Sequence, residues 1–174
     1  MSRIVPSILP YTLLKKESDG SPLLVFLLWR DRRSSSSESS AFWSSIVCPP
    51  HKEDNSPLDS VTRGFSEKTK GIFAPREMVF DSEHELEIVQ RKSPPKQKIE
   101  ESRIFMRKKL IKGDGVTLLS IRQYITYVAP VRFIDTETLN STFGYDKGEV
   151  EWVTAQDLCK EQRHANMIRR GRVD

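Results

Sequence analysis

The 174-residue sequence has few cysteines and no long apolar segment. Its two cysteines, Cys48 and Cys159, are too few and too far apart to predict a disulfide framework or a cysteine metal site, so we expect reduced thiols. The longest apolar run, Leu23–Trp29, has the length of a strand, whereas a membrane-spanning helix needs about eighteen residues or more. We therefore expect no membrane-spanning segment.

Targeting segments are also lacking at the start of the sequence. There is neither the apolar core of a secretory signal nor the Arg-rich amphipathic pattern of a transit peptide. Instead, apolar residues lead directly into a strand-like segment: Ile4, Val5, Ile8, Leu9 and Leu13. This start predicts an intracellular protein, in the cytoplasm in preference to an organelle.

Several catalytic motifs are absent. The sequence has no Gly-x-Ser-x-Gly elbow, no Walker Gly-Lys-Ser and no Gly-x-Gly-x-x-Gly, so the hydrolase, kinase and dinucleotide-binding classes that need them are not supported. His51 and Glu53 match the His-x-Glu of zinc deaminases, but no Pro-Cys-x-x-Cys follows. That class is excluded as well.

Length and charge indicate one globular domain over residues 1–174 with a slight basic excess. Charged residues make up 30% and apolar residues 37% of the chain, and the net charge is +4. We expect polar insertions at 30–41, which is rich in serine, and at 92–100, which is rich in proline and lysine. A basic tail at 168–174 suits a helix C-terminus or an RNA surface.

Runs of apolar, β-branched and aromatic residues predict strands over most of the remaining chain. These runs are 3–15, 22–30, 42–48, 72–80, 85–89, 103–112, 116–133 and 149–153. Gly113-Asp114-Gly115 predicts a hairpin turn after 103–112. We expect a loop over 135–148, and a closing helix capped by Thr154 that continues through Leu158 towards Met167.

The clearest local signal is a helix that begins near residue 57. Ser56 suits the N-cap, Pro57 the first helical position, and Asp59 the third position after the cap. Apolar residues then recur at helical spacing, and Gly71 ends the segment.

In this helix the chain resembles the Nudix hydrolase family. The family signature ends in Arg-Glu, an apolar residue, any residue, Glu-Glu, any residue, Gly and an apolar residue. The chain has Arg63, then Gly64 for the first Glu, Phe65 for the apolar residue, Glu67 for one Glu of the pair and Lys68 for the other. The closing Gly comes one residue late.

Two earlier positions of the signature also differ. Asn55 stands where the resemblance implies a Glu, and Pro49 where it implies a Gly. Elements in the family's order nevertheless cover nearly the whole chain, so the resemblance implies a Nudix-like α/β/α sandwich around a mixed sheet.

The resemblance implies that acids of this helix hold divalent metal ions on a diphosphate substrate. Only Glu67 remains here, and it is accompanied by the cations Arg63 and Lys68. A cation in place of a ligand repels a metal ion. We therefore predict no catalytic residue, no metal site and no cofactor, so the class leans away from enzymes, and Mg²⁺ belongs only to an alternative in which hydrolysis survives.

Other interpretations of these residues stay open. Arg63 and Glu67 are either a remnant site or an ordinary ion pair between adjacent helical turns. Replacement metal ligands would have to come from the turn before the helix or from late carboxylates. We favour the simpler explanation that these residues belong to a polar turn and a solvated surface: Glu53, Asp54, Glu137, Asp146 and Glu149.

Basic and aromatic residues offer a second candidate site. A basic sheet face with stacking rings would suit single-stranded RNA, and the alternative is an edge strand protected by lysines. The candidates are Arg107, Lys108, Lys109, Tyr127 and Trp43, of which Trp43 also suits the core.

The expected function is a non-catalytic Nudix-fold binding or assembly subunit, in a ribonucleoprotein or another multi-subunit complex. Its partners are expected to be proteins, RNA or both, and not a membrane. The alternative is a divergent metal-dependent pyrophosphohydrolase that acts on nucleoside diphosphate derivatives or RNA caps. A purely structural subunit is the third class, and the oligomeric state is open.

Overall fold

The computed structural model describes residues 4–30, 43–75, 77–80, 86–89, 95–143 and 148–160, the two short segments by backbone alone. Its elements in chain order are β1 (Val5–Lys15), β2 (Pro22–Arg30), β3 (Ile46–Val47), α1 (Pro57–Lys68), β4 (Glu77–Phe80), β5 (Leu86–Val89), α2 (Pro95–Lys112), β6 (Thr117–Ile121), β7 (Tyr124–Pro130), α3 (Thr136–Phe143) and β8 (Glu149–Thr154).

A six-stranded mixed sheet forms the centre of the fold. Its strand order is β6-β7-β1-β2-β8, and β3 pairs with β1 beside β2. β1 runs parallel to β7 and antiparallel to β2, so the predicted opening hairpin is confirmed. The predicted strand pair within 72–89 is also present, as the separate two-stranded sheet β4-β5, but its first strand begins at Glu77 and residues 72–74 form a turn. The mixed α/β class predicted from the sequence is thus correct.

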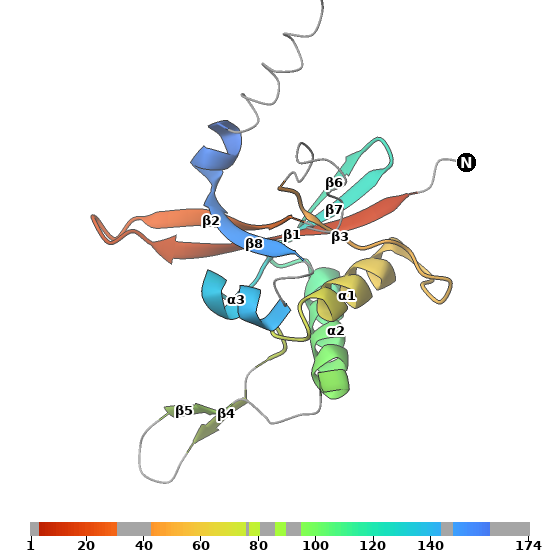
Figure 1. Ribbon diagram of the computed structural model, residues 1–174, viewed down its shortest axis with the longest axis horizontal. Coiled ribbons are helices and arrows are strands. Elements are labelled where there is room, and N and C mark those ends of the chain that lie inside the picture. The colour runs from red at the N-terminus through yellow and green to blue at the C-terminus, as the bar shows by residue number, and fades with distance from the viewer. Residues whose placement is uncertain are drawn as a thin grey trace, which may run out of the picture.

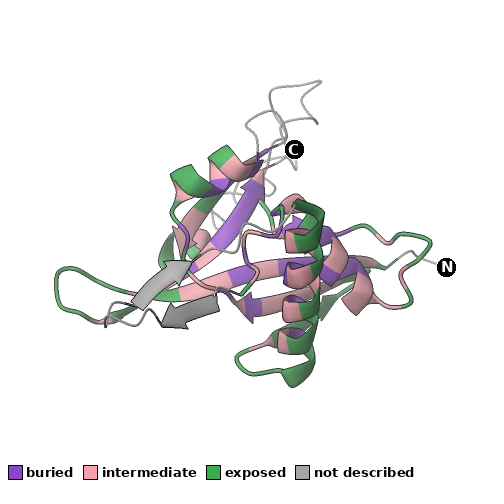
Figure 2. Ribbon diagram, turned by 90° about the horizontal axis from the view of Figure 1, so that it is seen from below, coloured by how far each residue is buried: buried purple, intermediate pink, exposed green. Residues whose placement is uncertain are grey.

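The three helices α1, α2 and α3 lie on the same side of this sheet (Figure 1). The core fills the space between the sheet and the helices, as the distribution of buried residues illustrates (Figure 2). Its largest fully buried side chains include Phe65 from α1, Met106 from α2 and Phe143 from α3. The described residues therefore form a sheet with three helices on one side, and the short helix over residues 155–160 lies on the other side of β8 (Figure 1).

Helix α1 begins as the sequence predicts. Ser56 is the N-cap and its side chain accepts a hydrogen bond from the Asp59 amide, with Pro57 in the first turn. Val61 and Phe65 are fully buried one turn apart. The helix ends at Lys68, and Gly71 follows with a φ of 71°, where its amide donates to the Ser66 carbonyl at 2.9 Å. This is the left-handed conformation that glycine adopts at helix ends.

The strand predicted over 103–112 is wrong, because these residues belong to helix α2. Ser102, Met106 and Leu110 are buried four residues apart, and α2 packs with this stripe against α1. The Ser102 and Ser66 hydroxyls lie 3.1 Å apart in that contact. The polar insertion predicted at 92–100 is also wrong from Pro95 onward, since residues 95–100 are helical.

The predicted hairpin turn at 113–115 instead ends α2. Gly113 has a φ of 79° and its amide donates to the Lys109 carbonyl at 3.1 Å, as a glycine does after a helix. The true hairpin lies within the predicted strand region 116–133, where Arg122 and Gln123 connect β6 to β7. β6 is the outer strand of the sheet, and it exposes Leu118 and Ile121.

The loop predicted over 135–148 is wrong in part, because it contains α3. Asp135 caps this helix: its side chain accepts hydrogen bonds from the amide and the hydroxyl of Thr138, at 2.8 and 2.7 Å. Leu139 and Phe143 are buried one turn apart. The eight-residue helix was missed because its remaining positions are polar.

The predicted last strand is confirmed as β8, which pairs with β2. Residues 155–160 continue as a helix, and the Thr154 hydroxyl accepts a hydrogen bond from the Asp157 amide at 3.1 Å, so the predicted cap is correct. Of the insertion predicted at 30–41, Arg30 belongs to β2 and the rest lies outside the described residues. The helix predicted beyond 160 and the basic tail predicted at 168–174 also lie outside them. None of the described helices combines the length and the apolar character that a membrane-spanning helix needs.

Candidate functional site

Arg63, on the face of α1 that points towards the preceding turn, forms the centre of an ion-pair network. Its Nε and Nη2 donate to the two carboxylate oxygens of Asp54 at 2.9 and 2.7 Å, which is a bidentate contact. Nη1 donates to Glu67 at 3.1 Å, and Nη2 also donates to the Pro49 carbonyl at 2.8 Å. One guanidinium thus connects α1 to the turn that leads into it.

The electrostatics of this pair favour the charged forms of both groups. The Asp54 side chain is 3% exposed and that of Arg63 is 20% exposed, so solvent screens the contact weakly. The hydrogen bonds from Arg63 hold the pKa of Asp54 well below its usual range, and those to Asp54 raise the pKa of Arg63. Asp54, considered from the sequence as a replacement metal ligand, is therefore bound to the arginine of its own chain.

Gly64 lies where α1 packs against Cys48, the residue after β3. A Cβ atom at this position would lie 2.8 Å from Cys48 Cβ and 3.0 Å from Cys48 Sγ. Both residues are buried. The side chain of a glutamate, which the Nudix signature places here, therefore has no room in this packing.

Lys68 is held at the other side of the helix. Its Nζ donates to the Val47 carbonyl at 2.7 Å and lies 5.5 Å from the centre of the Trp29 ring. Both contacts suit a cation. The lysine that replaces the second signature acid thus helps to connect α1 with β3 and β2.

Asp59, in the first turn of α1, is bound as well. It pairs with Arg107 of α2 and accepts a hydrogen bond from the Ser56 hydroxyl at 2.9 Å. Burial raises the pKa of Asp59, but Ser56 and Arg107 lower it more, so the net shift is downward. Burial and the negative charge of Asp59 raise the pKa of Tyr127.

The structure does not bring the five nucleic-acid candidates onto one face. Successive helical residues point about 100° apart, so Arg107, Lys108 and Lys109 diverge around α2. Arg107 pairs with Asp59, whereas Lys109 is half-buried, with its Nζ 5.6 Å from the Phe105 ring centre. Lys108 is exposed.

Tyr127 lies on β7 and is half-buried, so it belongs to a different element from the three basic candidates. Trp43 lies elsewhere, before β3, and is half-buried with the Arg30 guanidinium 4.8 Å from its ring centre. The predicted basic sheet face is therefore wrong, because its basic residues lie on a helix.

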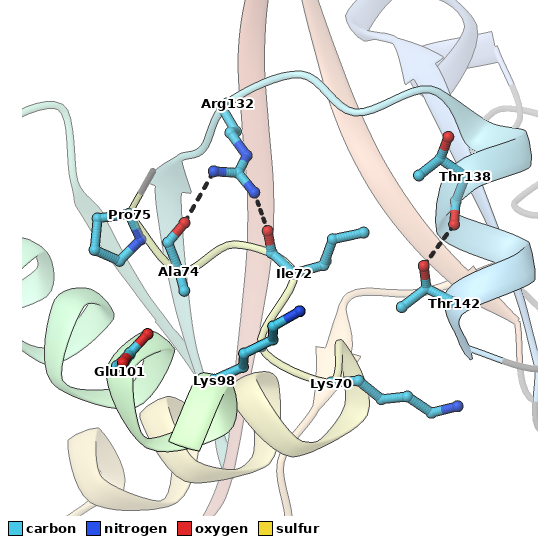
Figure 3. A pocket seen from close by; sticks show the side chains of 10 residues that line it. Lys70, Ile72, Ala74, Pro75, Lys98, Glu101, Arg132, Thr138 and Thr142 are labelled. Atoms are coloured by element: carbon cyan, nitrogen blue, oxygen red, sulfur yellow. Dashed lines mark hydrogen bonds between the residues drawn. The ribbon is translucent and has the colours of Figure 1, made fainter. Parts of the chain in front are cut away.

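A basic pocket that sequence reasoning missed lies at the end of α1. It has a volume of about 240 Å³, and its walls come from the turn after α1, the first half of α2, the loop after β7, and α3 (Figure 3). Three of its residues are cations: Lys70, Lys98 and Arg132. They are distant in sequence and belong to no motif, so only the fold could reveal that they share a pocket.

Metal ligands do not cluster in the described part of the chain. It contains no group of three or more His, Cys, Asp or Glu residues close enough to hold a metal ion. Asn55, where the resemblance implies an acid, is exposed in the turn before Ser56. Of the late carboxylates, Glu149 pairs with Arg30 and Glu137 is exposed, while Asp146 lies outside the described residues.

The comparisons with known proteins add no relative to this geometry. No protein-family model matches the chain, and no curated protein matches its sequence.

Proposed function

We propose that this chain is a Nudix-fold protein without hydrolytic activity that serves as a binding and assembly subunit of an RNA-containing complex. The proposal rests on one observation: acidic side chains in and beside α1 form ion pairs with arginines. Arg63 binds Asp54 and Glu67, and Arg107 binds Asp59. The order of elements supports the Nudix-like part: an opening hairpin, a helix with Arg63 and Glu67, a late strand and a closing helix.

Electrostatics disfavour metal-assisted hydrolysis at α1. Mg²⁺ binds through carboxylates and other oxygen ligands in a nearly ideal octahedral geometry. To recruit Asp54, a metal ion would have to break its bidentate contact with Arg63, and it would then lie beside a guanidinium that keeps only the more exposed Glu67 as an acidic partner. Lys68 and the close packing at Gly64 occupy two further signature positions. These residues fit a structural network better than a metal site.

Hydrolysis assays test this part of the proposal. The full chain would be incubated with nucleoside diphosphate derivatives and capped RNA in the presence of Mg²⁺ or Mn²⁺. We expect the same background turnover for the native protein and for Glu67→Gln. Turnover by the native protein that Glu67→Gln abolishes would overturn the proposal and establish the alternative, a divergent pyrophosphohydrolase.

The charge of α2 supports an RNA partner. The helix carries seven lysines and arginines against two glutamates. Exposed cations attract a phosphate backbone and release its counterions, which makes binding sensitive to salt. Lys108 is the best candidate for a contact with an RNA phosphate, because it is exposed and has no ion-pair partner within the described residues.

The RNA test compares two charge reversals that change the net charge equally. Lys108→Glu alters α2, and Lys16→Glu alters the turn between β1 and β2, at the opposite end of the sheet (Figure 1). Binding of a fluorescent single-stranded RNA is measured over a range of salt concentrations. We expect Lys108→Glu to weaken binding and to reduce the salt slope by about one, and Lys16→Glu to leave both unchanged.

Equal loss in the two variants would mean general attraction by net charge. No binding by the native chain would favour a purely structural subunit. Either result would overturn the RNA part of the proposal and leave the hydrolysis result unaffected.

A further inference from the structure

β6 forms one edge of the six-stranded sheet and lacks the features that usually protect an edge strand (Figure 1). All of its residues, Thr117–Ile121, are exposed, and none of them is charged, a proline or a glycine. The strand at the opposite edge, β8, carries Glu149 and Glu151. Charged side chains and prolines discourage pairing between sheet edges. Of the two edges, β6 is therefore the one suited to accept another strand.

The register of the β6–β7 hairpin decides which backbone groups of β6 point outwards. Ile121 lies opposite Tyr124 across a two-residue turn, so these two residues form a hydrogen-bonded pair. Hydrogen-bonded pairs alternate along an antiparallel ladder, which directs the amides and carbonyls of Leu118 and Ser120 away from β7. These groups have no partner within the described part of the chain. The edge thus offers two residues to a further strand.

Exposed apolar side chains accompany these backbone groups. Leu118 lies opposite Tyr127, which packs on the core between the sheet and the helices. Because side chains alternate along a strand, Leu119 and Ile121 lie on the other face of the sheet. Leu118, Leu119 and Ile121 are 56%, 43% and 66% exposed, and Tyr124 beside Ile121 is 47% exposed. Adjacent apolar side chains on an unpaired edge indicate an interaction surface.

The charges at the two ends of β6 indicate which strand fits. Arg122 follows the strand and has no ion-pair partner among the described residues, and Asp114 precedes the strand. Asp114 pairs with Lys112 at 2.7 Å, but these side chains are 71% and 76% exposed, so solvent weakens the contact. In an antiparallel second copy of β6, Arg122 would lie opposite Val116 of the other copy, with Asp114 nearer to it than Lys112. A neutral strand with opposite charges at its ends is complementary to itself.

We propose that two copies of this chain form a two-fold dimer in which the β6 strands pair antiparallel about Leu119 and join the two sheets into one. Leu118 of each copy lies opposite Ser120 of the other, and each of these pairs exchanges two hydrogen bonds. The two Leu119 side chains meet at the axis, with Thr117 opposite Ile121 on either side of it. Both copies use the same edge, so assembly closes at two chains.

Sedimentation of the full chain over a concentration series tests the dimer. We expect the native chain to associate reversibly to a dimer. Leu119→Lys would place two like charges at the axis, on Cα atoms about 4.5 Å apart, and should weaken association about tenfold or more. A lysine is well tolerated on an edge strand of a folded monomer. Leu13→Lys is the matched control: it changes an exposed leucine of β1 and should leave association unchanged.

A mixture of two variants separates loss of pairing from loss of folding. Leu119→Lys and Leu119→Glu should each associate weakly, because each places like charges at the axis. Mixed together they should form a dimer of one copy of each, since the opposite charges then face each other. A variant that had simply misfolded would not be restored by mixing, so a mixture that stays monomeric would contradict the pairing.

Disulfide formation tests the register. In Cys159→Ser, which leaves only the buried Cys48, Leu119→Cys should cross-link two copies under mild oxidation, because residues paired at the axis lie within the range of a disulfide. Thr117→Cys is the control on the same face. Its two copies would lie about 14 Å apart along the strands, which is too far for a disulfide.

Three results would overturn the proposal: a native chain that stays monomeric throughout the series, equal association of Leu119→Lys and the native chain, or equal cross-linking of the two cysteine variants. The paired strands include neither Arg63 nor Lys108. The outcome is therefore independent of the hydrolysis and RNA tests of the proposed function.

Discussion

Replacing Gly64 by alanine has two opposing effects on the free energy of unfolding, one from helix propensity and one from packing. Alanine is favoured over glycine within a helix by about 1 kcal/mol. However, an added Cβ would lie 2.8 Å from Cys48 Cβ, an atom that moves only with its backbone. Overpacking of this kind costs about 1 to 3 kcal/mol, and more where backbone must shift. We therefore expect Gly64→Ala to lower the free energy of unfolding, as measured by urea denaturation.

A double variant checks the cause of this loss. Combined with Cys48→Gly, which removes the opposing Cβ, Gly64→Ala should cost less than it does alone. If Gly64→Ala instead stabilised the protein, helix propensity would dominate at this position and the close contact would not constrain it.

Asp54 and Arg63 give the protein a defined response to acid. The pKa of Asp54 in the folded protein lies below that of an unfolded aspartate, about 3.9, because Arg63 donates two hydrogen bonds to it. The stabilisation is therefore complete above that unfolded pKa and is lost as the pH falls through the folded one. We expect Asp54→Asn to cost about 2 to 4 kcal/mol at pH 7, because the pair is largely buried.

Urea denaturation at pH 7 and at pH 3 measures this effect. The difference in unfolding free energy between the native protein and Asp54→Asn should narrow at pH 3, because the Asp54 carboxyl of the unfolded chain takes up a proton below its pKa of about 3.9 while the folded one stays ionised. Glu67→Gln, which removes the more exposed partner of Arg63, should cost less than about 1 kcal/mol. An Asp54→Asn cost that does not change with pH would contradict the assigned role of the charge.

Helix α2 allows the strand and helix interpretations to be tested at the scale of one element. In a strand, Ile104 and Met106 would share a face, because alternate residues point the same way. In α2, Met106 is fully buried whereas Ile104 is 48% exposed. We expect Met106→Ala to cost about 2 to 5 kcal/mol, and Ile104→Ala less than about 1 kcal/mol.

Thermal or urea unfolding of the two variants distinguishes the helix from the strand. Leu110→Ala adds a second buried position of the same stripe to the comparison. Similar losses of unfolding free energy in Ile104→Ala and Met106→Ala would contradict the helix and support the strand predicted over 103–112. All three variants replace an apolar residue by alanine, so the helix propensity of alanine favours each of them. The difference between their unfolding free energies therefore reports how deeply each native side chain is buried.

The elements that the sequence predicted correctly are those with local signals. Ser56 and Pro57 determine the start of α1 through contacts within one helical turn. The dense apolar run in β2 predicts a buried strand, because so many adjacent apolar side chains are unfavourable in water. α2 was missed because one of its three buried positions is Ser102, which hides the helical period. Its even-numbered residues Ile104, Met106 and Leu110 also happen to fit a strand.

In the candidate sites, too, contacts between residues close in sequence were predictable, whereas contacts between residues distant in sequence were not. The pair of Arg63 and Glu67 follows from helical spacing, and the sequence predicted it. The bidentate partner Asp54 lies nine residues away and depends on the path of the turn. The pocket of Lys70, Lys98 and Arg132 depends on how three elements pack, which no local pattern encodes.

At the scale of the whole molecule, Cys48 reports whether the helical layer separates from the sheet before global unfolding. It is fully buried between β3 and α1, and burial raises the pKa of its thiol to about 12. Only the thiolate reacts with disulfide reagents, so at pH 8 about one molecule in ten thousand carries the reactive form. Cys159, in contrast, is exposed.

We expect a thiol reagent to modify Cys159 rapidly in the native protein and Cys48 only when the protein unfolds. In Cys159→Ser, which leaves one thiol, labelling across a urea series should follow the loss of helical circular dichroism with the same midpoint, because Cys48 and α1 belong to one core. Labelling of Cys48 at urea concentrations that preserve the helical signal would show that α1 separates from β3 on its own, and that the network of Arg63 and Lys68 holds it less firmly than its contacts imply.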